Sequence, residues 1–588
     1  MSRRRPRWLP HPLWLIVSLT ITLAVLVPVA YVQLPDVYRW HTLNQLTADD
    51  LGERERALNY VIRHAGDDPA VRRGTIDRLE SIEDQANFVQ MVNALDRAGI
   101  WSRRHVSDDA WLRWLDILIE ADEAGMRRVA AEELATLTHR ADDARMHEML
   151  AALLEDEQAP VREAALRTAA LFVGEVEDAT PLLRMIGQRT RDEAPSIARH
   201  AWILLGLIEP ASGFSANWRQ APVEVAEAIL WAAVKTNPDR PQPALEAWRD
   251  VELAKRLRAM GLYALSLADD PQDIAPIVRD AMETQTTDDA MLQRRRVLLA
   301  GHVLRRWPEA LALPSIEPRT LLARDSAFAW SMAPRAEALT FTSEDELASV
   351  DAAALLAYLE GCDTGAVELA EVRPLSSMLR IAAARKMKSP RLRMLEPAFN
   401  SPHATVRDLA CIVAIERFEE GQLDTLIASL LTDLNDDAKM SGAILAGLTG
   451  LQTDLLRERA NQEDVWAVQK IMRVGLWMQG AAPAMTEQVP ALLTRRDVPR
   501  STLLMALLHR RHPAGLDYLL APHGELPSDL QRLLVHYRWW HVLERFLPDD
   551  APSLWLWADE ALHRFQIDVL RDWYLLHRGE LTRPTEDR

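Results

Sequence analysis

The sequence predicts an all-α protein, a curved α-solenoid of stacked antiparallel helix pairs preceded by one transmembrane helix. Three observations predict this fold. Residues 13–32 form an uncharged apolar run. Apolar residues follow helical spacing through most of the chain after about residue 50. Short turns rich in Asp and Pro recur, and equivalent positions in successive turns lie 33 to 36 residues apart. A chain of 588 residues also exceeds one compact core, as a repeat array would.

The apolar run begins at Leu13 and ends at Val32, which gives it 20 residues. At about 1.5 Å per residue such a helix spans the roughly 30 Å hydrocarbon core of a bilayer. Four arginines precede the run, so the positive-inside rule places residues 1–12, a basic N-terminus, in the cytoplasm. The rest of the chain is then extracytoplasmic, beginning with a juxtamembrane linker at residues 33–50.

Two alternatives to an uncleaved anchor remain, namely a cleaved signal peptide and a wholly cytoplasmic chain. A signal peptide has an apolar core of about 7–15 residues and small residues at its cleavage site. The run here is longer, and Pro28 lies close before Ala30, the one plausible small residue. The sequence therefore favours the anchor, with the lipid bilayer as one partner through Leu13 to Val32.

Composition narrows the class of protein. A hydrophobic content of 48% excludes a disordered chain. The net charge of −18 predicts no nucleic-acid partner, because phosphate contacts need clustered positive charge. The two cysteines, Cys362 and Cys411, are too few for a disulfide-built fold, and their pairing stays open. Since no Asn-x-Ser/Thr sequon occurs, we expect a bacterial protein of the inner membrane with its bulk in the periplasm.

The recurring turns carry a common pattern. They read DDPAVR at residues 67–72, EQAPVR at 157–162 and SPHATVR at 401–407. Asp or Ser suits the helix N-cap, and Pro suits the first turn of a helix. The following apolar residue should begin the buried face of its helix. The positions so predicted to be buried are Val71, Val161, Ile197 and Val406.

These turns resemble those of HEAT repeats, whose second helix typically opens with an Asp-Pro turn followed by Val-Arg and a small residue. The resemblance covers residues 51–480 and is weakest between about 215 and 395. A TPR array is the nearest competitor, but its Trp/Leu-Gly/Tyr pattern does not recur here. The resemblance implies a protein-binding scaffold with an extended concave surface, and it implies no cofactor.

Residues 481–578 differ in composition and predict an aromatic-rich helical cap, followed by a flexible tail at 579–588. Five of the 19 tryptophans fall within 35 residues of this region. Two adjacent tryptophans cannot both face one core from a single helix face. We therefore interpret part of this set as a partner-binding patch, with burial against a neighbouring helix as the alternative. The candidate partner-binding side chains are Trp539, Trp540, Trp555, Trp557, Trp573 and Tyr574.

Three histidines of the same region could instead line a ligand pocket, since aromatic rings exclude water and an imidazole supplies a tunable proton. They are His541, His563 and His577. No nucleophile elbow, phosphate-binding loop or zinc-protease motif occurs in the sequence, which argues against an enzyme, a cofactor and a metal.

Two functional hypotheses follow. The first is a membrane-anchored HEAT-like scaffold that presents a protein-binding surface on the extracytoplasmic side. The alternative is an enzyme or ligand-binding protein with its site in the C-terminal aromatic and histidine module. Convergence of the three histidines on one pocket would favour the alternative.

Overall fold

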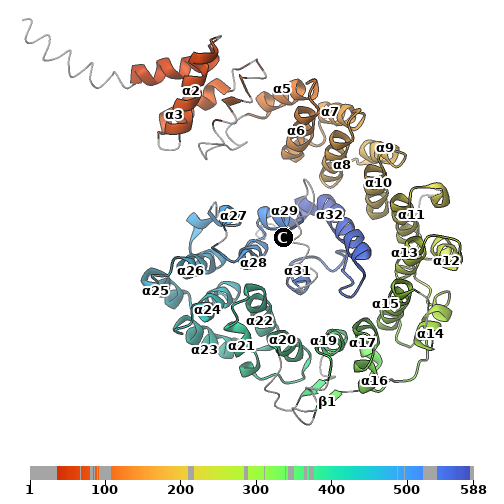
Figure 1. Cartoon of the computed structure of the whole chain (residues 1–588). Coiled ribbons are helices and arrows are strands. Elements are labelled where there is room, and N and C mark those ends of the chain that lie inside the picture. The colour runs from red at the N-terminus through yellow and green to blue at the C-terminus, as the bar shows by residue number, and fades with distance from the viewer. Residues whose placement is uncertain are drawn as a thin grey trace, which may run out of the picture. The chain divides into compact units, whose positions relative to one another are not determined.

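The computed structural model describes most of the chain after residue 35 (Figure 1). The described residues are 36–79, 107–208, 217–283, 289–341, 350–362, 367–369, 376–520 and 539–582, without residues 49, 66–67, 310, 338, 487 and 496, together with isolated residues between 82 and 94. The chain divides into two compact units, Met1–Leu137 and Thr138–Arg588.

The predicted transmembrane run, residues 13–32, lies outside the described residues. Within the described part of the chain, no helix has both the length and the apolar character needed to cross a bilayer.

The first unit consists of helix pairs. A helix at residues 36–44 leads into η1 (Gln45–Thr47), α2 (Leu51–His64) and α3 (Pro69–Leu79), and α5 (Asp108–Ile119) pairs with α6 (Ala124–Leu134). The 3-10 helix η3 (Ala135–Arg140) runs across the boundary between the units. The juxtamembrane segment predicted as a linker at 33–50 is therefore helical at residues 36–47, and its Leu43 and Leu46 are buried.

The second unit continues the helix pairs. Its α-helices are α7 (Ala144–Leu154), α8 (Ala159–Val173), α9 (Thr180–Arg189), α10 (Pro195–Ile208), α11 (Val223–Thr236), α12 (Gln242–Arg249), α13 (Lys255–Leu265), α14 (Ala275–Glu283), α15 (Ala290–Arg306), α16 (Pro318–Leu322), α17 (Ser326–Met332), α19 (Ala352–Gly361), α20 (Ser377–Lys386), α21 (Glu396–Phe399), α22 (Ala404–Arg417), α23 (Glu420–Leu431), α24 (Asp436–Thr449), α25 (Thr453–Gln462), α26 (Trp466–Met478), α27 (Gln488–Leu492), α28 (Arg500–His509), α29 (Pro513–Leu520), α31 (Trp540–Glu544) and α32 (Glu560–Thr582). Short 3-10 helices are η4 (Trp218–Gln220), η5 (Ala333–Arg335), η6 (Leu392–Met394) and η7 (Pro483–Met485).

The predicted turns open the second helix of a pair, as the repeat pattern requires. They precede α3, α8, α10 and α22. Val71, Val161 and Ile197 are fully buried, and Val406 is 7% exposed, which confirms the predicted register. In the first of these turns the Asp68 carboxylate accepts hydrogen bonds from the backbone N–H groups of Ala70 and Val71, so the expected N-cap is present.

In two of the turns, the arginine of the Val-Arg pair connects its own turn to the next one. Arg162 donates to the carbonyls of Asp156 and Glu157 in its own turn, and it forms two hydrogen bonds, of 2.9 and 2.8 Å, with Asp192 in the following turn. Although burial raises the pKa of Asp192, the Arg162 guanidinium holds that pKa below its ordinary value.

The same contacts recur later in the array. Arg407 bonds the Ser401 carbonyl and the Asp437 carboxylate, both at 2.6 Å. In both cases the arginine and the aspartate that pair come from successive repeats. Buried ion pairs therefore connect successive repeats, in addition to apolar packing.

The second helices of successive pairs pack on one another and form an inner row, running from α8 through α10, α11, α13, α15, α17, α19, α20, α22, α24 and α26 to α28. This row follows an arc within the second unit, and α31 and α32 lie on its inner side (Figure 1). The cap was predicted for residues 481–578. Its part from residue 539 on belongs to a segment at 539–582, here called the C-terminal segment, which lies on the inner side of the arc instead of covering its end. The long helix α32 also extends to Thr582, into the stretch predicted as a flexible tail.

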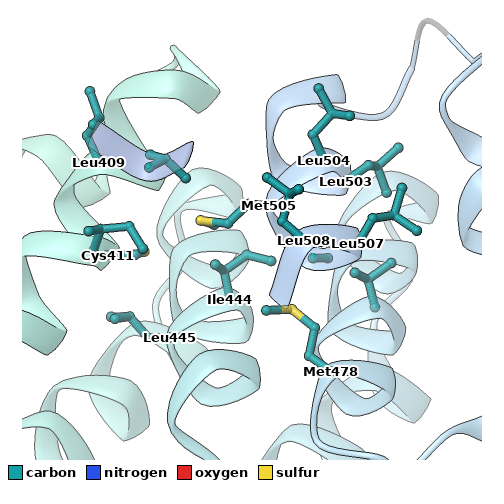
Figure 2. Close-up of a cluster of buried hydrophobic side chains, with 14 of the residues drawn as sticks. Leu409, Cys411, Ile444, Leu445, Met478, Leu503, Leu504, Met505, Leu507 and Leu508 are labelled. Atoms are coloured by element: carbon teal, nitrogen blue, oxygen red, sulfur yellow. The ribbon is translucent and has the colours of Figure 1, made fainter. Parts of the chain in front are cut away.

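The core reflects this arrangement. Helix α28 is buried on all sides, because α22, α24 and α26 pack on one part of it and α29 and α31 on another. Figure 2 shows Leu503, Leu504, Met505, Leu507 and Leu508 of α28 beside Ile444 and Met478. Cys411 lies in the same cluster, and both it and Cys362 are buried cysteines that form no disulfide with each other.

The middle of the array departs from regular helix pairs. Some of the places where the first helix of a pair is expected hold shorter elements. These are η4, the five-residue α16 and two three-residue strands, β1 (Leu339–Phe341) and β2 (Val367–Leu369). The strands are parallel, with Leu339 opposite Val367. The all-α prediction thus holds apart from this pair, and the departures fall between 215 and 395, where the repeat pattern in the sequence is weak.

Candidate functional site

The candidate partner-binding aromatics belong to the core of the second unit. Trp539, Trp540, Trp555, Trp557, Trp573 and Tyr574 are all between 0 and 9% exposed. They do not form an exposed patch, which corrects our interpretation of this set as a binding surface. The alternative, burial against neighbouring helices, describes them.

The adjacent pair Trp539 and Trp540 is buried because neither lies on a long helix. Trp539 is the N-cap of the five-residue α31, and Trp540 is its first residue. This single turn sits between α22 and α28, so it is covered from more than one side. The rule that one helix face cannot bury both rings therefore does not apply here.

The tryptophans before α32 contact the middle of the inner row. The Trp555 ring meets Tyr263 of α13 edge-on at 5.0 Å between centroids, and it lies 5.7 Å from the His302 ring of α15. Phe565 of α32 meets Trp231 and Tyr263 in the same manner. Edge-to-face aromatic contacts of this kind add to the apolar burial.

Charge pairs fix the C-terminal segment to the inner row. The segment supplies Asp559, Asp568 and Asp572, which pair with Arg295 of α15 at 2.6 Å and with Arg199 and His200 of α10 at 2.6 and 3.0 Å. Burial lowers the pKa of His200, but the nearby Asp572 carboxylate outweighs burial and raises it above its ordinary value. Burial raises the pKa of Asp559, while the Arg295 guanidinium lowers it, and the net shift is downward.

The far end of α32 is tied to the last repeats. Asp517 of α29 accepts two hydrogen bonds from Arg578, at 2.9 and 2.8 Å, and one from the Tyr574 hydroxyl at 3.0 Å. Arg571 donates to the Leu520 carbonyl at 2.7 Å. The C-terminal segment thus contacts α10 near the start of the inner row, α15 in its middle and α29 after its last helix.

The three candidate pocket histidines do not converge. His563 contacts the Trp555 carbonyl at 2.7 Å, and His577 contacts the Trp573 carbonyl at 2.9 Å. These two lie 14 residues apart on α32, about 21 Å along the axis at 1.5 Å per residue. His541 belongs to another helix, α31, where it faces Glu544. This arrangement does not support the alternative of a shared ligand pocket.

His541 does line a small apolar cavity between α19, α20, α22 and α31, together with Leu356, Met378, Ile381, Leu409 and Ile412. Its volume of about 50 Å³ is that of one or two water molecules. A polar groove of about 600 Å³ lies at the turn between α9 and α10, beside α11. Across the described residues, no group of three or more His, Cys, Asp or Glu side chains is placed to hold a metal ion.

The sequence analysis did not predict the ion pairs between successive turns, or those between the C-terminal segment and the inner row. The arginines that pair with the next turn could have been found in the sequence, because an arginine recurs directly after the buried valine. The residues that hold the C-terminal segment carry no such signal. Arg295 and Asp559, for example, carry no distinguishing pattern in the sequence, and only the fold brings them together.

No protein-family model and no curated protein matches the sequence. The chain is similar to solved structures of Kap121p and Kap95p, at low overall superposition. Kap121p alone shares 12% identity at a TM-score of 0.22, with 87% of this chain and 54% of that chain covered. Kap121p bound to Pho4p gives 12% identity and a TM-score of 0.23, covering 87% of this chain and 53% of that chain.

The Kap95p structure with RanGDP gives 12% identity and a TM-score of 0.20, covering 97% of this chain and 66% of that chain. The present chain thus spans between about half and two thirds of the length of these proteins.

Proposed function

We propose that this protein is a membrane-anchored HEAT-like scaffold that binds a protein partner on the periplasmic side of a bacterial inner membrane. The observation that carries the proposal is the stacked array of helix pairs, an architecture that offers extended surface to other proteins. The anchor rests on the apolar run from Leu13 to Val32 and its preceding arginines.

The inner side of the arc is an unsuitable partner surface, because the C-terminal segment already fills it. The buried charge pairs of Asp559, Asp568 and Asp572 would have to break before a partner could enter. This moves the proposed binding surface away from the concave face that the HEAT resemblance implies.

We place the surface instead at the turns that join outer to inner helices, around Leu434, Val465 and Trp466. These side chains are 97%, 43% and 37% exposed. Leu434 precedes α24, whereas Val465 and Trp466 open α26, and the 3.0 Å pair of Lys439 with Glu463 links the two turns. Exposed apolar side chains grouped in neighbouring repeats are a feature of protein-binding surfaces, and tryptophan is enriched among the residues that contribute most to binding.

Topology is tested by fusing alkaline phosphatase and green fluorescent protein separately to the C-terminus. The proposal requires an active phosphatase and a dark fluorescent protein, because fluorescent protein exported unfolded does not mature. The reverse result contradicts the periplasmic placement.

Partner binding is tested by placing a photo-crosslinking amino acid at Leu434 or at Trp466 in the full chain and irradiating intact cells. Gln188 of α9, an exposed polar position, is the matched control. We expect a discrete crosslinked protein from the first two positions and none from the control. Absence of any crosslink at Leu434 and Trp466 contradicts this surface.

A further inference from the structure

The first unit exposes an apolar face close to its start. Val37, Tyr38 and Trp40 of the helix at residues 36–44 are 58%, 60% and 63% exposed. Among the described residues, the next most exposed tryptophan is Trp466, at 37%. Three large apolar or aromatic side chains this exposed within four consecutive residues are unusual on a surface that faces only water.

The opposite side of the same helix is packed into the first unit. Thr42 and Leu43 are buried, and the Leu43 side chain lies so close to Gly74 of α3 that a Cβ there would approach it to 2.6 Å. Arg39 forms a 3.0 Å pair with Asp68 at the start of α3. The Tyr38 ring also meets Tyr60 of α2 edge-on at 5.9 Å. The exposed face is therefore held in a fixed orientation on a folded body.

Chain length limits how far this face can lie from the predicted anchor. From Val32, the last residue of the apolar run, to Val37 is five residues. Five residues span at most about 18 Å when fully extended. If residues 13–32 cross the bilayer, then Val37, Tyr38 and Trp40 lie beside the headgroup region, where tryptophan and tyrosine are favoured.

We propose that the face formed by Val37, Tyr38 and Trp40 lies on the bilayer surface, with its aromatic rings among the lipid headgroups. The proposal rests on the membrane anchor of the proposed function. The first unit would then lie on the bilayer surface, and its aromatic side chains would fix its orientation together with the anchor.

Charge does not oppose a lipid surface as the occupant of this face. Residues 36–79 contain seven arginines and eight acidic residues, so their net charge is 7 − 8 = −1, against −18 for the whole chain. This is close to a proportional share of the chain's charge, and it is small enough that an anionic membrane does not repel this part strongly. Apolar and aromatic contact can then determine the seating.

The test uses the full chain with Trp40→Cys, carrying a nitroxide spin label, in vesicles of phosphatidylethanolamine and phosphatidylglycerol. The native cysteines are each 1% exposed and are expected to react little. The readout is the collision rate of the label with oxygen and with a water-soluble nickel chelate, calibrated by lipids labelled in the headgroup. Val37→Cys is the second test position, and Leu434→Cys is a control exposed to 97%.

We expect the labels at positions 37 and 40 to collide with nickel several-fold less often than the label at 434, and to match the headgroup standard. Labels at 37 and 40 that are as open to nickel as the one at 434 overturn the proposal. Vesicle flotation separates the two levels of failure. A chain that floats while its labels stay in water contradicts only the seating, whereas a chain that does not float contradicts the anchor and the seating together.

Discussion

Arg295 and Asp559 lie 264 positions apart in the chain, yet their side chains form two hydrogen bonds of 2.6 and 2.8 Å. The Arg295 side chain is 1% exposed, and that of Asp559 is 19% exposed. The pair joins the middle of the inner row to the start of α32. It is the clearest sign that the chain fills the inner side of its own arc.

Removing one partner of this pair should destabilise the C-terminal segment. Arg295→Met leaves the Asp559 carboxylate poorly compensated and should cost about 3–5 kcal/mol. Because repeat arrays can unfold in parts, the measurement is amide hydrogen exchange in α32, which should lose protection.

Two variants control this experiment. The double variant Arg295→Met with Asp559→Leu should recover much of the loss, since no lone charge stays buried. Arg457→Met, which removes an exposed pair with Asp454, should cost only about 0–1 kcal/mol. A double variant no more stable than Arg295→Met would contradict the uncompensated Asp559 charge as the cause of the loss.

Gly174 lies where the end of α8 meets α32. A Cβ at this position would come within 2.0 Å of the Leu576 carbonyl oxygen, and backbone atoms cannot easily move away. Gly174→Ala should therefore cost about 1–3 kcal/mol through overpacking. Among the described residues, a Cβ at Gly187 of α9 would meet no other element within 4 Å, so Gly187→Ala should stabilise its helix by up to about 1 kcal/mol.

Thermal unfolding of the two glycine variants distinguishes close approach from helix propensity. The melting temperature should fall for Gly174→Ala and stay level or rise for Gly187→Ala. Equal shifts in the same direction would mean that α32 does not press on α8.

The repeat register could be predicted because its signals are local. Val71 and Val161 each follow an acidic turn that contains proline and each precede an arginine, and similar turns recur along the chain. Between 215 and 395 the outer helices shorten to elements such as α16, with five residues, which are too short to show a helical period.

The position of the C-terminal segment could not be predicted, because it depends on contacts between distant residues. Asp572 pairs with His200, which lies 372 positions earlier. The burial of the C-terminal tryptophans could not be predicted for the same reason. The adjacency of Trp539 and Trp540 suggested an exposed ring only if α31 were long, and this helix has five residues.

The His200 pair predicts a pH dependence. The pKa of His200 is raised in the folded state, so the folded state favours its protonated form. Its contribution to stability is then fully present below the unfolded pKa of about 6.5 and is lost as the pH rises through the folded value. We expect the free energy of unfolding of wild type to exceed that of His200→Gln at pH 6, and the gap to narrow towards pH 8. A gap that widens over this range would contradict a raised pKa.

A second pH dependence is expected from Asp408, whose negative charge should destabilise the fold. It lies on α22 and is 2% exposed, and one carboxylate oxygen accepts a 2.9 Å hydrogen bond from the Thr502 hydroxyl of α28. Burial raises its pKa to about 6, although the hydrogen bonds from Ser501 and Thr502 oppose the rise. Stability from this group is present below the unfolded pKa of about 3.9 and is lost as the pH rises to about 6, a change of about 3 kcal/mol.

Asp408→Asn should abolish this loss, because the amide keeps an acceptor oxygen for Thr502 and carries no charge to desolvate. At pH 7 the variant should therefore be more stable than wild type in urea unfolding, by up to about 3 kcal/mol, and the two should approach each other towards pH 4. Asp454→Asn, at a carboxylate that is 98% exposed, is the matched control and should leave the pH profile unchanged. If Asp408→Asn is less stable than wild type at pH 7, the carboxylate is a favourable partner of α28 and the argument from burial fails.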